Sequence, residues 1–160
     1  MRHALVLLAA LVLLTALTAV PALAQRGPDP GAANPEAAVR ATVARLFDGM
    51  RARDSSAVAA TLHPHARLMT VVQDGEGHRL VEGDLGRFKT AVAASPVRLD
   101  ERVDDVEVRL DDGLATAWMA YRFYAGARFS HCGVNAMQLA LGADGWRIVH
   151  IMDTRREGCE

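Results

Sequence analysis

The chain is poor in several residue types, and each shortage narrows what the protein can do. Lys89 is the only lysine among 160 residues, so Schiff-base chemistry would depend on that single amine. Basic residues are not in excess: 18 lysines and arginines stand against 19 aspartates and glutamates. Nucleic-acid-binding domains carry a clear basic excess, so this balance argues against nucleic acid as a partner. Cys132 and Cys159 are the only cysteines.

The N-terminal segment, residues 1–24, has the pattern of a secretory signal peptide. Arg2 precedes an apolar run at 4–20, and Ala22-Leu23-Ala24 forms a small-residue cleavage site. An uncleaved anchor is the alternative, because the run approaches the roughly 20 residues that span a bilayer. No cysteine lies near the cut, which argues against a bacterial lipid anchor. We therefore expect an exported protein, periplasmic or secreted, with no membrane contact after cleavage.

Removal of residues 1–24 would leave 136 of the 160 residues, a length that suits one domain. Only Arg2 is lost from the charged residues, so 17 basic residues face 19 acidic ones, a net charge near −2. Residues 25–34 are rich in proline and glycine and predict a flexible linker. The domain itself is expected at 35–160.

Three helices are predicted from apolar spacing and capping residues. The first begins at Pro35 with Asn34 as its N-cap and ends at 51–53. A second, short helix is capped by Asp54 or Ser55 and extends to Leu62, and a third spans 83–94. The apolar stripe of the first helix consists of Val39, Val43, Leu46, Phe47 and Met50.

The remaining segments alternate in the manner of strands. Two short strands with a turn between them are expected at 67–73 and 78–81, and a longer strand at 97–109. An antiparallel meander follows at 114–124, 129–141 and 146–154, because glycine-containing turns separate three runs rich in aromatic and branched residues. The fold class expected is α+β, with three N-terminal helices packed in a curved, mostly antiparallel sheet.

The turns of the meander give a register. If Tyr124 faces Phe129, then Arg122 faces His131; a turn centred on Ala143 places His131 opposite Arg155. Polar groups then gather on one face, unless a bulge exchanges part of the assignment. The predicted ligand-binding residues on this face are Trp118, Arg122, His131, Asn135, Asp153 and Arg155.

The pair His131 and Asp153 is the best acid–base candidate in the chain. An imidazole exchanges protons near neutral pH, and a nearby carboxylate orients it and raises its pKa. Arg122 or Arg155 would supply positive charge for an anionic ligand or an oxyanion. A hydrogen-bonded polar cluster that only fixes the sheet is the alternative interpretation, because buried polar groups need partners whether or not they react.

His63 and His65 raise the question of a metal site. Together with His131 they would approximate three zinc ligands, but Pro64 separates the first two and no second spaced pair occurs. Exposed or capping histidines are the simpler interpretation. We expect no metal and no cofactor.

The order of elements and three short motifs resemble the nuclear transport factor 2-like superfamily. The motifs are Leu46–Met50 with Arg53-Asp54, the Leu62–Ala66 link and the Gly145–Ile148 ending. This group includes SnoaL-like polyketide cyclases, ketosteroid isomerase, scytalone dehydratase and lumazine-binding-like proteins. The resemblance covers about 35–156 and implies a conical pocket enclosed by the sheet, with pairing of two copies through the outer sheet face.

One departure from the family bears on function. Isomerase-like members share a catalytic carboxylate near the start of the first strand, where this chain has His63 and His65. The isomerase mechanism therefore does not transfer residue by residue. We expect an exported module that binds a small, partly apolar or anionic ligand in the cone. The alternatives are an isomerase, dehydratase or hydrolase using His131 and Asp153, and a dimeric structural or partner-binding domain.

Export and an even cysteine count favour a disulfide between Cys132 and Cys159. The expected register places Cys132 opposite Thr154, five residues short of Cys159. The bond therefore requires 156–158 to turn back, and Gly158 permits the backbone angles of such a turn.

Overall fold

The computed structural model describes residues 34–75 and 77–159, so the expected signal peptide and nearly all of the expected linker lie outside the described residues. The fold is α+β, with the elements in the expected order. The third helix follows the first hairpin, as the expected range of 83–94 places it, so only the description of all three helices as N-terminal is wrong. In chain order the elements are α1 (Pro35–Ala52), α2 (Ser55–Thr61), β1 (Leu62–Asp74), β2 (Gly77–Gly83), α3 (Leu85–Ala94), β3 (Leu99–Asp111), β4 (Leu114–Ala125), β5 (Arg128–Gly142) and β6 (Gly145–Arg155).

Helix α1 begins and ends where its capping residues dictate. The Asn34 side chain accepts a hydrogen bond from the Ala37 amide at 2.9 Å, and Pro35 occupies the first turn. The helix ends at Arg53, whose φ of 58° is left-handed. All five residues of the predicted apolar stripe are buried, which confirms that prediction.

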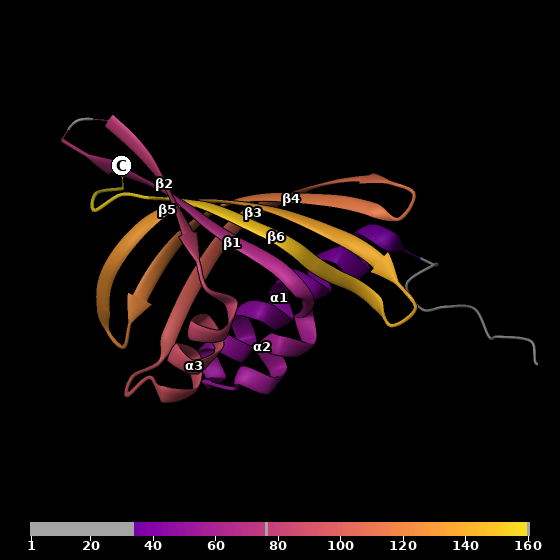
Figure 1. Cartoon of the computed structure of the whole chain (residues 1–160), viewed down its shortest axis with the longest axis horizontal. Coiled ribbons are helices and arrows are strands. Elements are labelled where there is room, and N and C mark those ends of the chain that lie inside the picture. Colours follow the sequence, from indigo (N-terminus) through magenta and orange to yellow (C-terminus); the bar gives the residue numbers. More distant parts are fainter. Residues whose placement is uncertain (1–33, 76, 160) are drawn as a thin grey trace, which may run out of the picture.

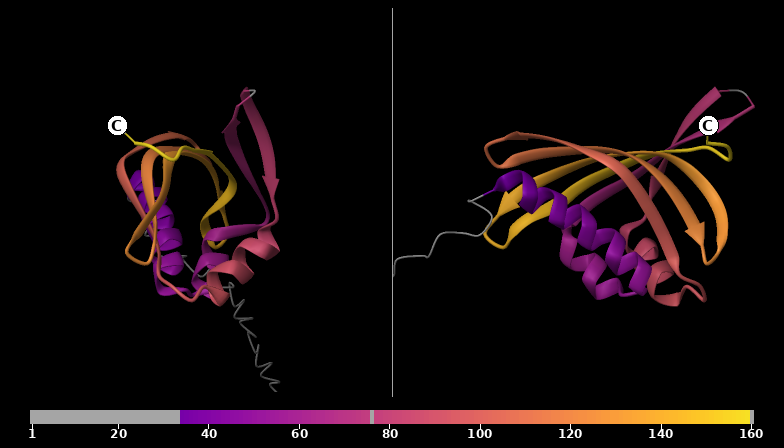
Figure 2. Two further views of the ribbon diagram at one scale, coloured as in Figure 1. Left: turned by 90° about the vertical axis from the view of Figure 1, so that its left-hand side faces the viewer. Right: turned by 180° about the vertical axis from the view of Figure 1, so that it is seen from behind.

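One six-stranded sheet runs in the order β2-β1-β6-β5-β4-β3. Neighbouring strands are antiparallel except for β1 and β6, which are parallel. The sheet curves over the helices, and the free end of the β1–β2 hairpin projects beyond it (Figure 1). Strands β3 to β6 curl around α1 when the molecule is viewed from its side (Figure 2). The curved, mostly antiparallel sheet predicted from the sequence is therefore present.

The core fills the concave face of the sheet. Helix α1 contributes its apolar stripe, and β4, β5 and β6 contribute alternate residues that point toward the helices. The largest fully buried side chains include Leu46, Met119, Met137, Leu139 and Ile148. The opposite, convex face of the sheet carries the other set of alternate residues.

A bulge between β4 and β5 overturns part of the predicted register. Tyr124 faces Phe129 as predicted, but Ser130 is an extra residue, so Phe123 rather than Arg122 faces His131. One inserted residue exchanges the two faces of a strand. The side chains of β4 that share a face with His131 are therefore the buried set that includes Met119 and Tyr121.

Strands β5 and β6 are offset from the prediction by two residues. Asn135, not Gly133, lies opposite Asp153. The turn 142–145 is tighter than expected, and a second bulge at Val149 adds one more residue of offset. Because side chains alternate with period two, the offset of two beyond the bulge leaves Asp153 and Arg155 on their predicted face. Before the bulge the offset is one, so Ile148 lies on the face opposite to the predicted one and is buried in the core.

Candidate functional site

A cavity of about 370 Å³ lies between the concave face of the sheet and the helices. Its apolar residues come from α1, α3, β1, β5 and β6, and its polar residues come from β1, from the start of α3 and from β3 to β6. The apolar residues include Leu46, Phe47, Met50, Leu68, Phe88 and Ile151. The polar residues are Thr70, Asp84, Arg87, Glu101, Tyr121, His131, Asn135, Asp153 and Arg155.

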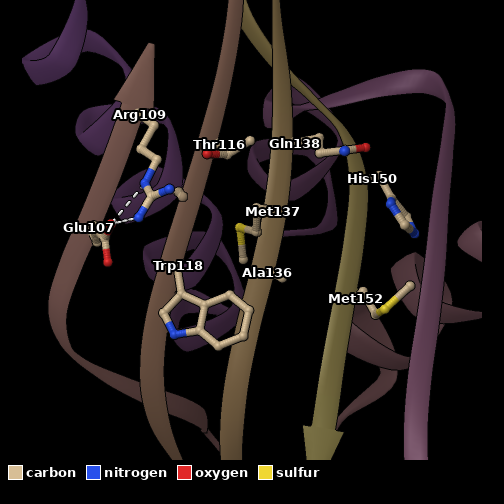
Figure 3. Close-up of a pocket in the computed structure, with 10 residues that line it drawn as sticks. Glu107, Arg109, Thr116, Trp118, Ala136, Met137, Gln138, His150 and Met152 are labelled. Carbon is tan, nitrogen blue, oxygen red and sulfur yellow. Dashed lines mark hydrogen bonds and ion pairs between the residues drawn. The ribbon is translucent and has the colours of Figure 1, made fainter.

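Four of the six predicted ligand-binding residues line this cavity: His131, Asn135, Asp153 and Arg155. Trp118 and Arg122 do not, and their assignment to the pocket is wrong. Both lie on the convex face because the bulge at Ser130 reverses the faces of β4 relative to β5. In Figure 3 the Trp118 indole lies on the side of the sheet away from the helices, next to residues of β5 and β6.

Asp153 is the centre of a hydrogen-bond network at the end of the cavity. Its carboxylate accepts hydrogen bonds from Thr70 Oγ1 at 2.5 Å, Tyr121 Oη at 3.2 Å and Arg155 Nε at 2.9 Å. Burial, together with the charges of Asp153 and Glu101, raises the pKa of Tyr121 far above its ordinary value. Tyr121 therefore keeps its proton and acts as a donor. Burial lowers the pKa of Arg155, but the hydrogen bond and charge of Asp153 outweigh it and raise that pKa.

A close approach between β5 and β6 positions this network. The Thr154 carbonyl accepts a hydrogen bond from Tyr121 Oη at 2.9 Å, while Thr154 Oγ1 accepts one from the Val134 amide at 3.1 Å. A Cβ at Gly133 would overlap the Thr154 carbonyl oxygen. Glycine at this position is therefore what lets the Thr154 carbonyl reach Tyr121.

Glu101 is a second carboxylate in the cavity, and sequence reasoning missed it. Its Oε1 accepts a hydrogen bond from Asn135 Nδ2 at 2.6 Å. Burial raises the pKa of Glu101 to about 7; the Asp153 charge adds to this rise, whereas the Asn135 hydrogen bond and the Arg155 charge oppose it. The side chain can therefore gain or lose a proton near neutral pH.

Arg51 of α1 fixes the strand that carries Glu101. Its guanidinium donates to Asp100 Oδ1 at 3.0 Å and to the Glu101 carbonyl at 3.4 Å. Asp100 is only 5% exposed, so this contact ties the end of the helix to the start of β3 inside the fold. The backbone of Glu101 is thereby held against the helix.

His131 lines the cavity, and the charge of Asp153 affects its pKa, but the two side chains form no hydrogen bond. Its Nδ1 is 3.0 Å from Ser130 Oγ, and its ring packs against Phe123 at 5.0 Å and edge-on to Tyr121 at 5.7 Å. Within the described residues, Asp153 receives its hydrogen bonds from other groups. Burial and the Arg155 charge lower the pKa of His131, opposed by Asp153, so the imidazole is neutral at neutral pH.

The sequence did contain a signal for Glu101. Along β3 the apolar residues occupy odd positions up to Val103 and even positions from Val106 onward. Asp105, with φ of 42°, lies in a bulge between these two halves. The first half therefore points Leu99, Glu101 and Val103 inward, whereas a strand of uniform alternation would place all of its charged residues on one solvated face.

Cys132 and Cys159 form a disulfide, as predicted, with their Cα atoms 6.2 Å apart. The offset of β6 brings Cys132 opposite Arg156, through backbone hydrogen bonds of 2.9 and 3.0 Å. Cys159 is then only three residues beyond its partner's position, not five. The bond fixes the segment that directly follows Arg155.

Neither a metal cluster nor a membrane-spanning helix is found in the described part of the chain. No group of three or more histidine, cysteine, aspartate or glutamate side chains is arranged there to hold a metal ion. His63 and His65 are exposed on β1, with ring centroids 5.6 Å apart. Residues 34–75 and 77–159 include no helix with the length and apolar character needed to cross a bilayer.

A protein-family model described as "Putative lumazine-binding" matches residues 34–152. The chain belongs to this family. The match confirms the resemblance to the nuclear transport factor 2-like superfamily and covers α1 to nearly all of β6. None of the curated proteins matches this lumazine-binding-like chain.

Solved structures of low sequence identity share the fold. A Mycobacterium tuberculosis protein of unknown function superposes with a TM-score of 0.61 at 17% identity, over 75% of this chain and 70% of that one. A cystatin-like-fold domain of unknown function from Nostoc punctiforme gives 0.56 at 22% identity, over 76% of each chain. An NTF2-like protein from Streptomyces avermitilis, described as a "putative dehydratase", gives 0.59 at 14% identity, over 76% and 96%. At such identities the likeness establishes the fold alone.

Proposed function

We propose that this protein is an exported binding module that holds a small, partly apolar ligand in the cavity between sheet and helices. The observation that carries the proposal is the division of the cavity wall. One part is built from aliphatic and aromatic side chains and the other from the network around Asp153 and Glu101. Small-molecule sites have this character, an apolar enclosure with a few placed polar groups.

The size of the cavity limits the ligand. A volume of about 370 Å³ lies at the lower end of the range for small-molecule pockets, which begins near 300 Å³. A molecule of one or two fused rings fits this space. Most of the exposed cavity residues belong to α3 and the segment just before it, so we place the entrance there; they are Gly83, Asp84, Arg87 and Ala91. Arg155 on β6 is the further exposed residue of the cavity wall.

Cavity binding is tested by blocking the entrance without disturbing the fold. Ala91 lines the cavity from α3 and is exposed, so Ala91→Trp should obstruct it at little cost in stability. Ala93→Trp, two residues along the same helix, is the matched control because Ala93 is exposed and does not line the cavity. In a thermal-shift screen of small aromatic compounds, hits should raise the Tm of the wild type and the control, but not of Ala91→Trp. Hits that stabilise all three proteins equally would refute the proposal.

Acid–base catalysis is a second candidate, favoured by the state of Glu101. A carboxyl group with a pKa of about 7 exchanges protons efficiently at neutral pH, and Asn135 holds it in place. This shifts the catalytic candidate from the His131–Asp153 pair to Glu101. Tetralone in deuterated water offers a test, since a base in the cavity would accelerate deuterium incorporation beside the ketone. Incorporation at the same rate with Glu101→Gln would exclude Glu101 as that base.

Export is proposed from the N-terminal pattern alone, because residues 1–24 lie outside the described part of the chain. Cleavage after Ala24 would yield a chain that begins at Gln25. Intact mass of the protein recovered from a bacterial periplasm checks this, and a mass that includes the leader would contradict it.

We further propose that two copies pair through the convex face of the sheet. This face has a hollow of about 510 Å³ beside Trp118, whose side chain is 56% exposed, and His150 Nε2 is buried there without a partner among the described residues. Figure 3 shows Trp118, His150 and Met152 around this hollow. Exposed apolar surface of this kind marks interaction sites. Sedimentation should show a dimer that Trp118→Glu dissociates and Trp118→Phe retains; a monomeric wild type would refute the pairing.

A further inference from the structure

We propose that the ligand of this cavity carries one positive charge on its apolar body, and that its cationic nitrogen binds the Glu101 carboxylate. The inference rests on the proposed binding function and names the chemical class of the ligand. The inference follows from a comparison of the charged groups around the cavity: protein groups of opposite charge already pair with some of them, but not with Glu101.

Seven ionisable groups face the cavity. They are Asp84 and Arg87 at the start of α3, Glu101 on β3, Tyr121 on β4, His131 on β5, and Asp153 and Arg155 on β6. Asp84 and Arg87 are exposed near the entrance, where solvent screens them. Tyr121 and His131 are uncharged at neutral pH for the reasons given above. Arg155 is also exposed, but its Nε is paired with Asp153. The charges that remain inside the cavity are therefore those of Glu101 and Asp153.

The Asp153 carboxylate already has a cationic partner and hydrogen-bond donors within the protein. Arg155 Nε lies 2.9 Å from one carboxylate oxygen, and the hydroxyls of Thr70 and Tyr121 supply further donors. The Asp153 side chain is only 12% exposed, although its partner Arg155 is 51% exposed, so the carboxylate itself lies largely away from bulk water. A ligand cation would add little there, because the charge is already neutralised and hydrogen-bonded.

Glu101 is not matched. Asn135, which is neutral, is the one side chain among the described residues that donates to its carboxylate, and no cationic nitrogen forms an ion pair with it there. A carboxylate removed from water is stable only when it is paired or protonated. The place of a counter-ion beside the Glu101 carboxylate is thus left to a ligand. Glu101 lines the cavity, so a bound ligand can reach it.

The same charges disfavour the other ligand classes. An anion would meet two carboxylates and a guanidinium that is already engaged by Asp153. A neutral hydrogen-bond acceptor would need Glu101 in its protonated form, and it would gain an ordinary hydrogen bond, about half as strong as a charge-assisted one. A cation gains from Glu101 and from the residual field of Asp153 together. Phe47 and Phe88 in the cavity wall add aromatic faces that also attract a cation.

Three probes of matched shape separate these classes: naphthylmethylamine, naphthylmethanol and naphthoic acid. Titration calorimetry on the wild type should rank the amine at least about tenfold tighter than the alcohol, with the acid weakest. Glu101→Gln should lower the affinity for the amine by about tenfold or more and leave the alcohol unchanged. Asp111→Asn, on the same strand and exposed, is the matched control, because Asp111 lines neither the cavity nor the hollow beside Trp118; it should change neither affinity.

The pH dependence in the wild type tests the same idea without any substitution. Ionised Glu101 should increase from about one tenth near pH 6 to about nine tenths near pH 8, while the alkylammonium stays protonated. The affinity for the amine should therefore rise about tenfold over this range, with release of a proton. A ligand held by protonated Glu101 would show the opposite slope.

The outcomes distinguish this inference from the binding function beneath it. If the alcohol or the acid binds as tightly as the amine and Ala91→Trp abolishes that binding, the cavity function stands and the cationic class is wrong. An amine affinity that falls with pH, or that Glu101→Gln leaves unchanged, overturns the inference in the same way. If no probe binds, or Ala91→Trp has no effect on any of them, both proposals fail.

Discussion

Glu101→Gln should make the protein more stable, and by an amount that depends on pH. Burial is the main reason that the pKa of Glu101 rises from an ordinary value of 4.5 to about 7, and the Asp153 charge adds to it. The folded protein therefore holds the Glu101 proton more tightly than the unfolded chain does. Glutamine keeps the length of the side chain and an oxygen for the Asn135 amide, but it cannot ionise.

The sign and size follow from proton linkage. Between pH 4.5 and about 7 the folded state binds more protons at Glu101 than the unfolded state, so the wild type loses stability as the pH rises through this window. The full loss corresponds to about 3 kcal/mol. The glutamine variant escapes it and should gain about 1 kcal/mol near pH 5, about 2 kcal/mol near pH 6 and about 3 kcal/mol near pH 8.

Urea denaturation of both proteins across this pH range measures the gain directly. Asp111→Asn provides the baseline, because Asp111 is exposed on β3 and lines neither the cavity nor the hollow beside Trp118. A difference that does not change with pH would mean that Glu101 titrates alike in the folded and unfolded chains. A loss of stability near pH 8 would show that a cation in the protein already matches Glu101, contrary to the structure.

Other parts of the site give predictions of their own. Gly133→Ala should destabilise the fold by about 2–3 kcal/mol in urea denaturation, because its Cβ would overlap the Thr154 carbonyl. The control Gly158→Ala, whose Cβ would meet open space, should cost less than about 0.5 kcal/mol. Equal effects of the two substitutions would contradict the close approach of Gly133 to Thr154. Reduction of the Cys132–Cys159 disulfide should lower the free energy of unfolding by about 3–4 kcal/mol, and an unchanged denaturation midpoint in reductant would disprove this contribution. His131→Ala should weaken naphthylmethylamine binding about tenfold and change stability by less than about 1 kcal/mol; a loss of about 1–3 kcal/mol with binding intact would make His131 structural.

Elements that depend on local sequence signals could be predicted from the chain alone. Asn34 and Pro35 locate the start of α1, and Asp54 caps α2 with hydrogen bonds to two backbone amides at 2.9 Å. The two turns of the meander likewise delimit β4, β5 and β6. These signals act between residues that are neighbours in sequence, and tertiary packing does not override them here.

Which face of a strand lines the cavity was less predictable, because a single extra residue decides it. The extra residue Ser130 places Trp118 and Arg122 on the convex face. Between β5 and β6, the tighter turn and the bulge at Val149 each shift the register by one residue, and together they leave Asp153 and Arg155 on the predicted face. No hydrophobic pattern marks Ser130 as a bulge. Asp105 differs, since the apolar positions change phase across it, and that change would have placed Glu101 inside.

The place of β6 in the sheet has a consequence for how the chain is made. This strand follows all the others in sequence, yet it lies between β1 and β5 and is the link that joins the first hairpin to β3, β4 and β5. During synthesis the earlier strands emerge from the ribosome as two separate pieces with unpaired edges, and neither can close around the helices. Closure of the sheet must wait for β6, which makes this step slow because it joins segments far apart in the sequence. The export that we propose, in which the chain passes a membrane channel before folding, would be served by that delay.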